Sequence, residues 1–527
     1  MSPSEDKHNR PNLAQRYEQL SGIRSSYLDR ARECAALTIP TLIPPESNSS
    51  GTKYPTPRQS VGSRGVNSIS ARYLLTLFPP NEPFFRLTVA ESVLAELSGT
   101  EGARGEVEEA MASIERSIML KMETTPIRPI IFEAFKHLIV AGNVCLHFLP
   151  GLEGAKLFRL DRYVCKRDPM GNLLEIIVKE DLSLMEVPEE LREELKGTLK
   201  ASMKHDTEDS LELYTCVRKK APGEWEVWQE INGLYVEASE GEYTDENLPW
   251  LVFRYNEITG EDYGRGLVEE YLGDLRALEG LRKAILDGAA AASKVIFLVK
   301  PNGTTKQRAL AQAENGAIIN GNRQDVDVLQ VDKYADFKVA QEQAAAIEES
   351  LSYAFLLNSA IQRNGERVTA EEIRYLAAEL ETARGGSYSA FTQSIQRPTL
   401  RIIMSAMEAA GELPKLPKGI VKPLITTGIE AIGRGNDLQK LMQFVGILEQ
   451  VSKAEGLELY LDKGELIKRT AASLNIDVKG LVIPAEQRAE MQQEAMMQSM
   501  ISQGLPNAVN ALGGMAKQEM INQQQQP

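Results

Sequence analysis

The chain has 527 residues, 43% of them hydrophobic, and a formal net charge of -15 at pH 7. A chain of this length exceeds what one hydrophobic core usually holds, so we expect several folded regions and exclude a disordered tail. The charge argues against a protein that grips DNA through a basic patch, because affinity for phosphates comes from clustered Lys and Arg, and the sequence contains no basic block.

Cysteine spacing and the longest polar and apolar runs exclude further classes. No CxxC pair occurs, so we expect no zinc site and predict four buried, reduced cysteines: Cys34, Cys145, Cys165 and Cys216. The opening residues "MSPSEDKHNR" lack the apolar stretch of a signal peptide. The uncharged run 495–516 is rich in Gln, Ser and Asn, and we predict no membrane helix.

The N-terminal third is expected to be mainly helical. Apolar residues at helical spacing predict helices over 12–39, about 66–77, 106–123 and 130–140, with a loop at 44–65. Residues 77–87 read "LFPPNEPFFRL", in which Phe78, Phe84 and Phe85 need burial while three prolines forbid a regular helix or a central strand. Either the rest of the chain or another copy of it must cover these rings.

The middle of the chain predicts an antiparallel sheet that extends to about residue 257. The segment "KLFRLDRYVCKRDPMGNLLEIIVKE" predicts two strands joined at the turn "DPMGN", and "LELYTCVRKK" with "EWEVWQEI" predicts a second pair. A long helix over 263–294 follows, with apolar residues on more than one face, which indicates contact with two neighbours.

Three short strands, "VIFLV", "GAIIN" and "VDVLQV", are then predicted, separated by turns, before a helix over 337–357. The segment "NSAIQRNGERV" (358–368) interrupts the helical pattern. Thr369 and Glu372 form a capping box that opens a helix to residue 410, which Gly385-Gly386 and Pro398 should bend. From 411 onward the pattern is helical.

Candidate chemistry is sparse. The sequence has no phosphate-binding GxxxxGK[ST] loop, and its four histidines form no metal-binding pair. His137 and His147 flank an apolar segment and are interpreted as core histidines with satisfied hydrogen bonds. The acidic clusters lack the spacing of a calcium loop. We therefore expect no catalytic residue, no cofactor and no metal.

The order of parts, together with "LFPPNEPFFRL", "VAGNV" (140–144), "YGRGLVEEYLGDLR", "NSAIQRNGERVTAEEIRYLAAELE" and "TTGIEAIGRGNDLQKL", resembles the portal, or head-to-tail connector, of short-tailed double-stranded DNA bacteriophages. The similarity covers nearly the whole chain. It departs from the commonest motif at Gly266, where a small polar residue is usual, and in the Gln-rich terminus.

The resemblance implies an α+β, mainly α, portal fold, assembled as a ring of about a dozen subunits, a dodecamer, around an axial DNA channel. It implies no enzymatic activity. Its regions would be an N-terminal wing (1–262), a first stem helix (263–294), the clip (295–336), a second stem helix (337–357), a tunnel loop (358–368), a long kinked wing helix (369–410) and a crown or barrel with the C-terminal tail (411–527).

The implied location is the capsid portal vertex of the virion, reached by assembly in the bacterial cytoplasm. Expected partners are further copies of the chain, double-stranded DNA, the terminase, the tail adaptor, the major capsid protein, and scaffolding and internal core proteins, but no membrane.

The residues expected at sites follow from the same resemblance. They are Gln362, Arg363, Asn364 and Arg367 in the tunnel loop, Pro301, Asn302, Asn322 and Arg323 for docking at the clip, and Phe78, Phe84 and Phe85 for packing in the wing. The tunnel-loop arginines have an alternative role, pairing with Glu366 or Glu371 and only stiffening the turn.

Two other readings of the whole chain stay open on the sequence alone. A cytosolic helical scaffold without a DNA role would explain the acidity and the helices, but not the order of helix, strands, helix and loop. An enzyme would have only dispersed carboxylates to work with.

Overall fold

The computed structural model describes residues 12–45, 51–80, 83–89, 103–187, 210–292, 296–329, 334–357, 379–380, 390–414 and 421–425. The chain divides into two compact units, one of Met1–Arg86, Arg116–Pro417 and Pro423–Ile429, the other of Leu87–Glu115, Lys418–Lys422 and Glu430–Pro527. In the second unit the backbone N–H of Leu87 donates to Glu115 Oε1 at 2.7 Å. The sites discussed below lie in the first unit.

The predicted N-terminal helices are confirmed as α1 (Leu13–Ala36), α2 (Val61–Leu77), α4 (Ala103–Thr124) and α5 (Ile127–Ala141). Helix α2 begins earlier than expected because side chains hold its first turn. Gln59 Oε1 accepts from the N–H of Gly62 at 2.9 Å, and the Glu279 carboxylate accepts from the N–H of Arg58 at 2.8 Å. The N–H of Gly62 is one of the first-turn donors that have no partner within the helix, whereas the Glu279 carboxylate binds the backbone just before the helix begins.

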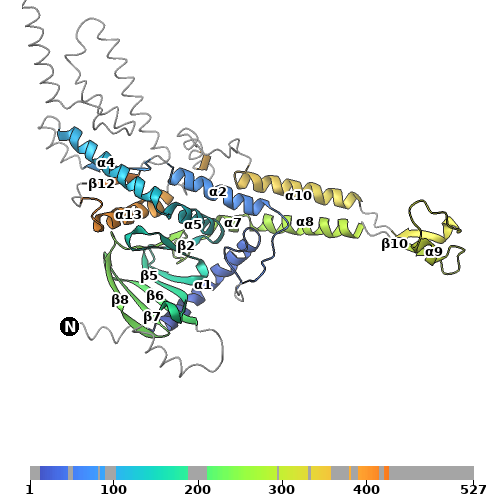
Figure 1. Ribbon diagram of the computed structural model, residues 1–527, viewed down its shortest axis with the longest axis horizontal. Coiled ribbons are helices and arrows are strands. Elements are labelled where there is room, and N and C mark those ends of the chain that lie inside the picture. The colour runs from blue at the N-terminus through green and yellow to red at the C-terminus, as the bar shows by residue number, and fades with distance from the viewer. Residues whose placement is uncertain are drawn as a thin grey trace, which may run out of the picture. The chain divides into compact units, whose positions relative to one another are not determined.

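Two antiparallel sheets form the predicted β region (Figure 1). One has the order β3-β2-β9 and the other β4-β5-β6-β7-β8. The strands are β2 (Asn143–Phe148), β3 (Ala155–Phe158), β4 (Tyr163–Arg167), β5 (Leu173–Ser183), β6 (Ser210–Ala221), β7 (Glu224–Ile231), β8 (Leu234–Thr244) and β9 (Trp250–Arg254).

Both predicted strand pairs are present, with one correction. The turn "DPMGN" joins β4 to β5, and there Gly171 adopts φ +86°, a conformation that favours glycine. Strands β6 and β7 pair as expected. The stretch "KLFRLDRYVCKR" is not one strand, because the turn Leu160–Arg162 divides it between β3 and β4, which belong to different sheets.

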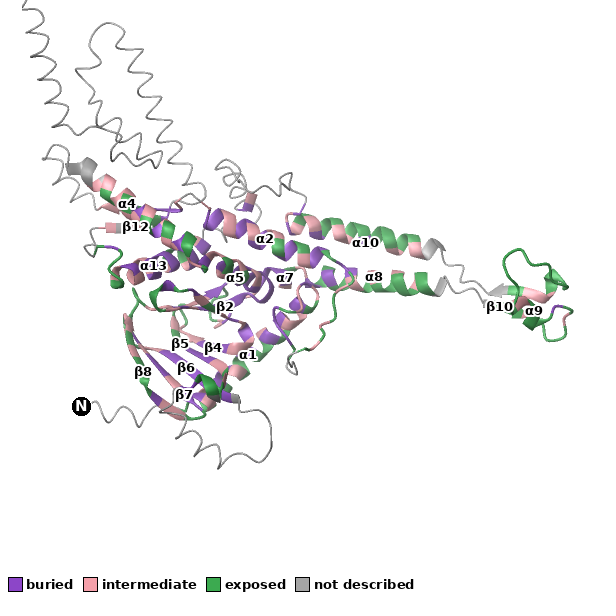
Figure 2. Cartoon of the chain, in the orientation of Figure 1, coloured by how far each residue is buried: buried purple, intermediate pink, exposed green. Residues whose placement is uncertain are grey.

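One hydrophobic core lies where α1 packs on the five-stranded sheet. Its buried residues are Leu13, Tyr17 and Leu20 of α1 with Val164, Ile177, Tyr214, Cys216 and Trp228 of the strands. Buried residues also fill the region of α2, α5 and β2, whereas α8 and α10 are largely exposed (Figure 2).

The "LFPPNEPFFRL" rings are covered by the chain itself. Phe78, Phe84 and Phe85 are all buried, and their rings contact one another edge to face, with centroids 5.1 Å apart for Phe78–Phe84 and 5.2 Å for Phe84–Phe85. Of the two alternatives that the sequence left open, cover by the rest of the chain is the one observed.

The predicted helix over 263–294 is shorter and interrupted. It consists of α7 (Leu267–Glu270) and α8 (Leu272–Ala292), with a break at Tyr271. Residues before α7 are extended, because Arg265 forms a two-way backbone bridge with Asn256 at 3.0 and 3.1 Å. Helix α10 (Tyr334–Ala354) packs against α8. Its bounds are close to those predicted for the second stem helix, 337–357.

The predicted three-stranded clip contains two strands in its described residues, β10 (Ile296–Val299) and β11 (Val326–Leu329), which pair antiparallel. Residues 316–320, "GAIIN", are not a strand, since within the described part of the chain they have no ladder partner and Ile318 is fully exposed. A short helix, α9 (Gln307–Ala311), was not expected.

Near the predicted bend at Pro398 the helix contains a π-helical turn, Thr392–Gln396, followed by α13 (Arg397–Ala409). A π turn interrupts the regular hydrogen-bond ladder where proline would also interrupt it. The predicted capping box at Thr369 and bend at Gly385-Gly386 lie outside the described residues.

Val421–Ile425, within the region predicted as helical, form β12, because Pro423 forbids a helix interior. None of the described helices is long and apolar enough to cross a membrane. The remaining short strand is β1 (Phe85–Val89).

Candidate functional site

Two of the sequence motifs interlock at the start of α7. The side-chain amide of Asn143 in "VAGNV" donates to the carbonyl of Gly264 at 2.7 Å, and its Oδ1 accepts from the N–H of Gly264 at 2.7 Å. A Cβ on Gly142 would lie 2.4 Å from the backbone of Arg265, and a Cβ on Gly266 would lie 2.6 Å from the carbonyl oxygen of Val140. Glycine at 266 is therefore required by close backbone approach.

The two turns predicted as the clip's docking sites are one cross-linked structure. Asp325 Oδ2 accepts from the N–H and the hydroxyl of Thr304 at 2.7 and 2.9 Å, and from the N–H of Thr305 at 3.2 Å. The Thr305 hydroxyl accepts from the N–H of Asn322 at 2.9 Å. Hydrogen bonds from Thr304 lower the pKa of Asp325. This carboxylate joins "PNGTT" to "GNRQD", which are about 20 residues apart in sequence.

Close packing at two glycines completes the cross-link. A Cβ on Gly303 would lie 2.6 Å from Asp325 Cγ, and a Cβ on Gly321 would lie 2.4 Å from Thr305 Oγ1. The predicted docking residues Pro301, Asn302, Asn322 and Arg323 are exposed around it. All four lie on the two turns that these hydrogen bonds join, and Asn322 itself has a structural role, since its backbone N–H donates to the Thr305 hydroxyl.

Helices α8 and α10 form a pair with one face unburied. Arg282 of α8 forms an ion pair with Glu348 of α10. The Phe337 ring of α10 packs directly on Gly288 of α8, where an added Cβ would lie 2.1 Å from the ring. On the outer surface Leu286, Val339 and Tyr353 are each more than half exposed. Within the described part of one copy, large apolar side chains of this pair are therefore uncovered.

A buried arginine holds the C-terminal end of α10. Arg72 of α2 donates to the carbonyl of Leu356 at 2.7 Å and pairs with Glu379 at 2.6 Å. Leu356 adopts φ +54°, a left-handed conformation that ends the helix. Arg72 thus bonds residues on both sides of 358–378. The predicted tunnel-loop residues Gln362, Arg363, Asn364 and Arg367 lie within that span, outside the described residues.

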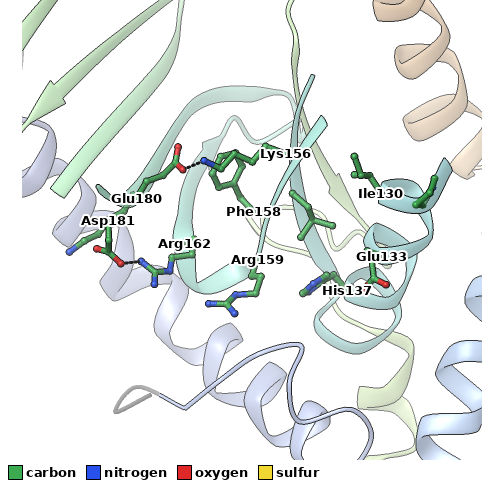
Figure 3. A pocket seen from close by; sticks show the side chains of 12 residues that line it. Ile130, Glu133, His137, Lys156, Phe158, Arg159, Arg162, Glu180 and Asp181 are labelled. Carbon is green, nitrogen blue, oxygen red and sulfur yellow. Dashed lines mark hydrogen bonds and ion pairs between the residues drawn. The ribbon is translucent and has the colours of Figure 1, made fainter. Parts of the chain in front are cut away.

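A cavity of about 600 Å³ lies between α5, β3 and β5 (Figure 3). Its cations are already engaged, because Lys156 pairs with Glu180 and Arg162 pairs with Asp181. Burial, with Arg159 nearby, lowers the pKa of His137 to about 3, so this imidazole is a weak base. The other two lining cations are also paired, Arg159 with Asp161 and Lys179 with Glu212, which differs from a site arranged for acid–base catalysis.

The other titratable candidates behave as core groups. Burial lowers the pKa of His147 to about 4, and its ring stacks on Trp250 with centroids 4.0 Å apart. The expectation of satisfied histidines fails at His137, whose Nδ1 has no hydrogen-bond partner among the residues that the structure describes. All four cysteines are buried and free, as predicted, and no cluster able to hold a metal occurs among the residues that the structure describes.

Sequence reasoning missed Arg72 and Asp325. Each acts through partners far away in sequence or through backbone groups, and single residues of these types give no local signal. The pair of turns around Asp325 could have been suspected, since both were predicted, but their contact could not.

The family model "Bacteriophage head to tail connecting protein" matches residues 10–482 of the chain. The portal protein of Escherichia phage T7 is 40% identical over 512 residues, which cover 95% of this chain and 93% of that protein. The portal protein of Enterobacteria phage T3 is 39% identical over 94% of this chain and 92% of its own length. That of Enterobacteria phage SP6 is 30% identical over 97% of both.

Proposed function

Because the chain belongs to the bacteriophage head-to-tail connecting protein family, we propose that its copies form a closed ring of about a dozen subunits around a DNA channel. Portal proteins are structural parts of the virion's portal vertex and are not enzymes, which also sets aside the scaffold and enzyme readings. In this proposal α8 and α10 form the stem, residues 295–336 the clip, 1–262 and 369–410 the wing, and 411–527 the crown or barrel.

The observation that supports the ring is the apolar surface that one copy leaves uncovered. Phe297 and Leu298 of β10 are each about half exposed. Successive residues of a strand point to opposite faces, so both faces of the two-stranded sheet are uncovered. Such an isolated pair of strands is marginally stable in water. Neighbouring copies would cover these faces and the outer side of α8 and α10.

Ring closure needs two different faces on each subunit. Leu286 on α8 and Val339 on α10 supply apolar side chains on separate helices. Burial of such a side chain from full exposure contributes about 1.5–3 kcal/mol. Leu286 and Val339 are 54% and 58% exposed, so each would gain about half of that, and every subunit of the ring repeats the contribution.

The acidic charge of the chain suits a channel through which DNA slides, since a basic lining would bind each phosphate that it met. We place Gln362, Arg363, Asn364 and Arg367 at the narrowest part, where each arginine recurs around the ring. Their alternative role, pairing with Glu366 or Glu371, predicts no effect on DNA retention. The proposed clip docks terminase during packaging and the tail adaptor afterwards, while the capsid, scaffolding and core proteins contact other regions.

Assembly is tested with Leu286→Glu and Val339→Glu in purified protein. Wild type should give rings with a central hole in negative stain and a single large mass in mass photometry, and the double variant should give monomers. Met170→Glu, at a largely exposed position of the β4–β5 turn, is the matched control and should leave rings intact. Wild-type protein that stays monomeric or dimeric at micromolar concentration contradicts the ring.

The channel role is tested with the double variant Arg363→Ala and Arg367→Ala. We expect rings of unchanged thermal stability whose filled heads leak DNA or stall during packaging. Normal packaging and retention would support the alternative in which these arginines only stiffen the turn.

A further inference from the structure

Helices α8 and α10 run antiparallel, and their contacts fix the register between them. Arg282 of α8 pairs with Glu348 of α10, and further along α8 the backbone of Gly288 lies against the Phe337 ring. Residue numbers therefore fall along α10 as they rise along α8, and four residues on either helix span about 6 Å. Positions at equal distances from the contact between Gly288 and Phe337 thus lie at the same level.

Exposed charges of opposite sign occupy two such levels. Asp287 of α8 and Lys338 of α10 are the sequence neighbours of the contact, and Lys283 and Glu342 lie one helical turn away from them. Residues four apart share a face of a helix, so each helix carries one cation and one acid on one face. Lys283 is at the level of Glu342, and Asp287 is at the level of Lys338.

These four charges do not meet within one copy. All four side chains are exposed, and none forms an ion pair or hydrogen bond with the part of the chain that the structure describes. Leu286 and Val339, each more than half exposed, lie next to Asp287 and Lys338 in sequence. The outer faces of the two helices thus carry complementary charge patterns beside uncovered apolar side chains.

We propose that α8 of one subunit contacts α10 of the next, with Lys283 paired to Glu342 of the next subunit and Asp287 paired to its Lys338. Rotation about the ring axis carries each residue to the same height in the next copy, so levels that match within one copy also match between neighbours. The inference rests on the proposed ring, and it adds which two faces meet and which charges set their register.

Charge favours this contact over contacts between two copies of the same helix. Parallel packing of α8 on α8 would place Lys283 against Lys283, and like charges across an interface disfavour it. Antiparallel packing of α8 on α8 would pair Lys283 with Asp287, but such a two-fold contact ends at a dimer and leaves the α10 face uncovered. Packing of α8 on α10 pairs every charge and can be repeated around a ring.

Two charge-swapped variants test the pairing without changing the net charge. Lys283→Glu/Asp287→Lys reverses the pattern on α8, and Lys338→Glu/Glu342→Lys reverses it on α10. Each variant alone brings like charges together twice at every interface, so half-assembly at low salt should need about tenfold more protein than wild type in mass photometry. An equal mixture of the two variants should assemble at the wild-type concentration, because alternating subunits restore opposite charges at every interface. The fourfold variant should do the same.

Matched variants separate assembly from folding. Lys220→Glu/Glu242→Lys swaps an exposed ion pair within one copy and should assemble like wild type. The unassembled swap variants should melt at the temperature of the Leu286→Glu/Val339→Glu monomer, and a lower value would overturn the inference by showing that the charges act within one subunit. Wild-type assembly of the α8 variant alone, as packing of α8 on α8 predicts, also overturns it, as does a mixture that assembles no better than its components. Wild-type protein without rings would instead refute the proposed ring.

Discussion

Replacing Arg72 with methionine tests how the structure fixes the chain on either side of residues 358–378. The arginine side chain is 8% exposed and Glu379 is 21% exposed. Methionine keeps much of the aliphatic bulk but removes both the ion pair and the bond to the Leu356 carbonyl. The variant therefore removes the Arg72 donor from a carboxylate and from a carbonyl.

The expected cost follows from burial. Breaking a buried ion pair by removing one partner costs about 3–5 kcal/mol. Water can reach Glu379 in part, so the lower end applies, and we expect about 3 kcal/mol. Lysine at position 72 should recover only part of this, because an ammonium group is a point charge and cannot bond both partners in the fixed fork geometry of a guanidinium.

Hydrogen exchange measures this effect locally, which suits a large chain that need not unfold in one step. If 3 kcal/mol is lost, amides of residues 351–357 should exchange about 100-fold faster, since 1.4 kcal/mol corresponds to a factor of ten. Lys220→Met removes the exposed pair with Glu242 and should change exchange at 351–357 very little. A change below about threefold in the Arg72 variant would refute the reasoning, because it would mean that Arg72 does not hold this end of α10.

Three further outcomes follow from single groups. His137 has a folded pKa of about 3 against about 6.5 unfolded, so between pH 6.5 and pH 3 protonation favours the unfolded chain by about 1.4 kcal/mol per pH unit. The variant His137→Leu should therefore unfold at a lower pH than wild type. An unchanged midpoint of acid unfolding contradicts the assignment. Because the pKa of Asp325 is lowered, its contribution to the stability of the fold is present above pH 3.8 and is lost as the pH falls. The variant Asp325→Ala should make the clip segment sensitive to protease at neutral pH. Resistance equal to that of wild type would refute the role of Asp325 as a cross-link. Gly288→Ala should lower the melting temperature because its Cβ meets Phe337, while Gly280→Ala, in open space, should raise it slightly; equal effects would disprove close packing at 288.

The elements that sequence predicted correctly are those with a periodic pattern of their own. Helix α1 and the β6–β7 pair each have a clear period and their own start or turn signals. The errors fall where a contact outside the segment decides. Arg265 is extended because Asn256 pairs with it, although its local pattern is helical. The segment "GAIIN" was predicted as a strand, but it pairs with no strand in the described chain and is a loop.

Site prediction was limited in the same way. The position of the clip turns was predictable from Gly, Asn and Asp, but their union through Asp325 was not. Arg72 and Glu379 are 307 residues apart, and no local pattern links them. The "LFPPNEPFFRL" rings posed a question that composition could not answer, because burial by the same chain and burial by another copy require the same residues.

Burial along α8 shows how much of the stem one subunit can complete. Leu272, Leu275 and Leu278 are buried, whereas Ile285 is half-buried and Leu286 is exposed. Their spacing continues one helical stripe, so the chain supplies the apolar face along the helix but covers it only near the first turns. A monomer would not gain from extending that stripe, since exposed apolar residues favour aggregation. The uncovered part is useful only if the next subunit buries it, and the same reasoning applies to Val339 on α10. The α8–α10 pair, the proposed stem, is therefore where loss of apolar character should break assembly while leaving the subunit folded.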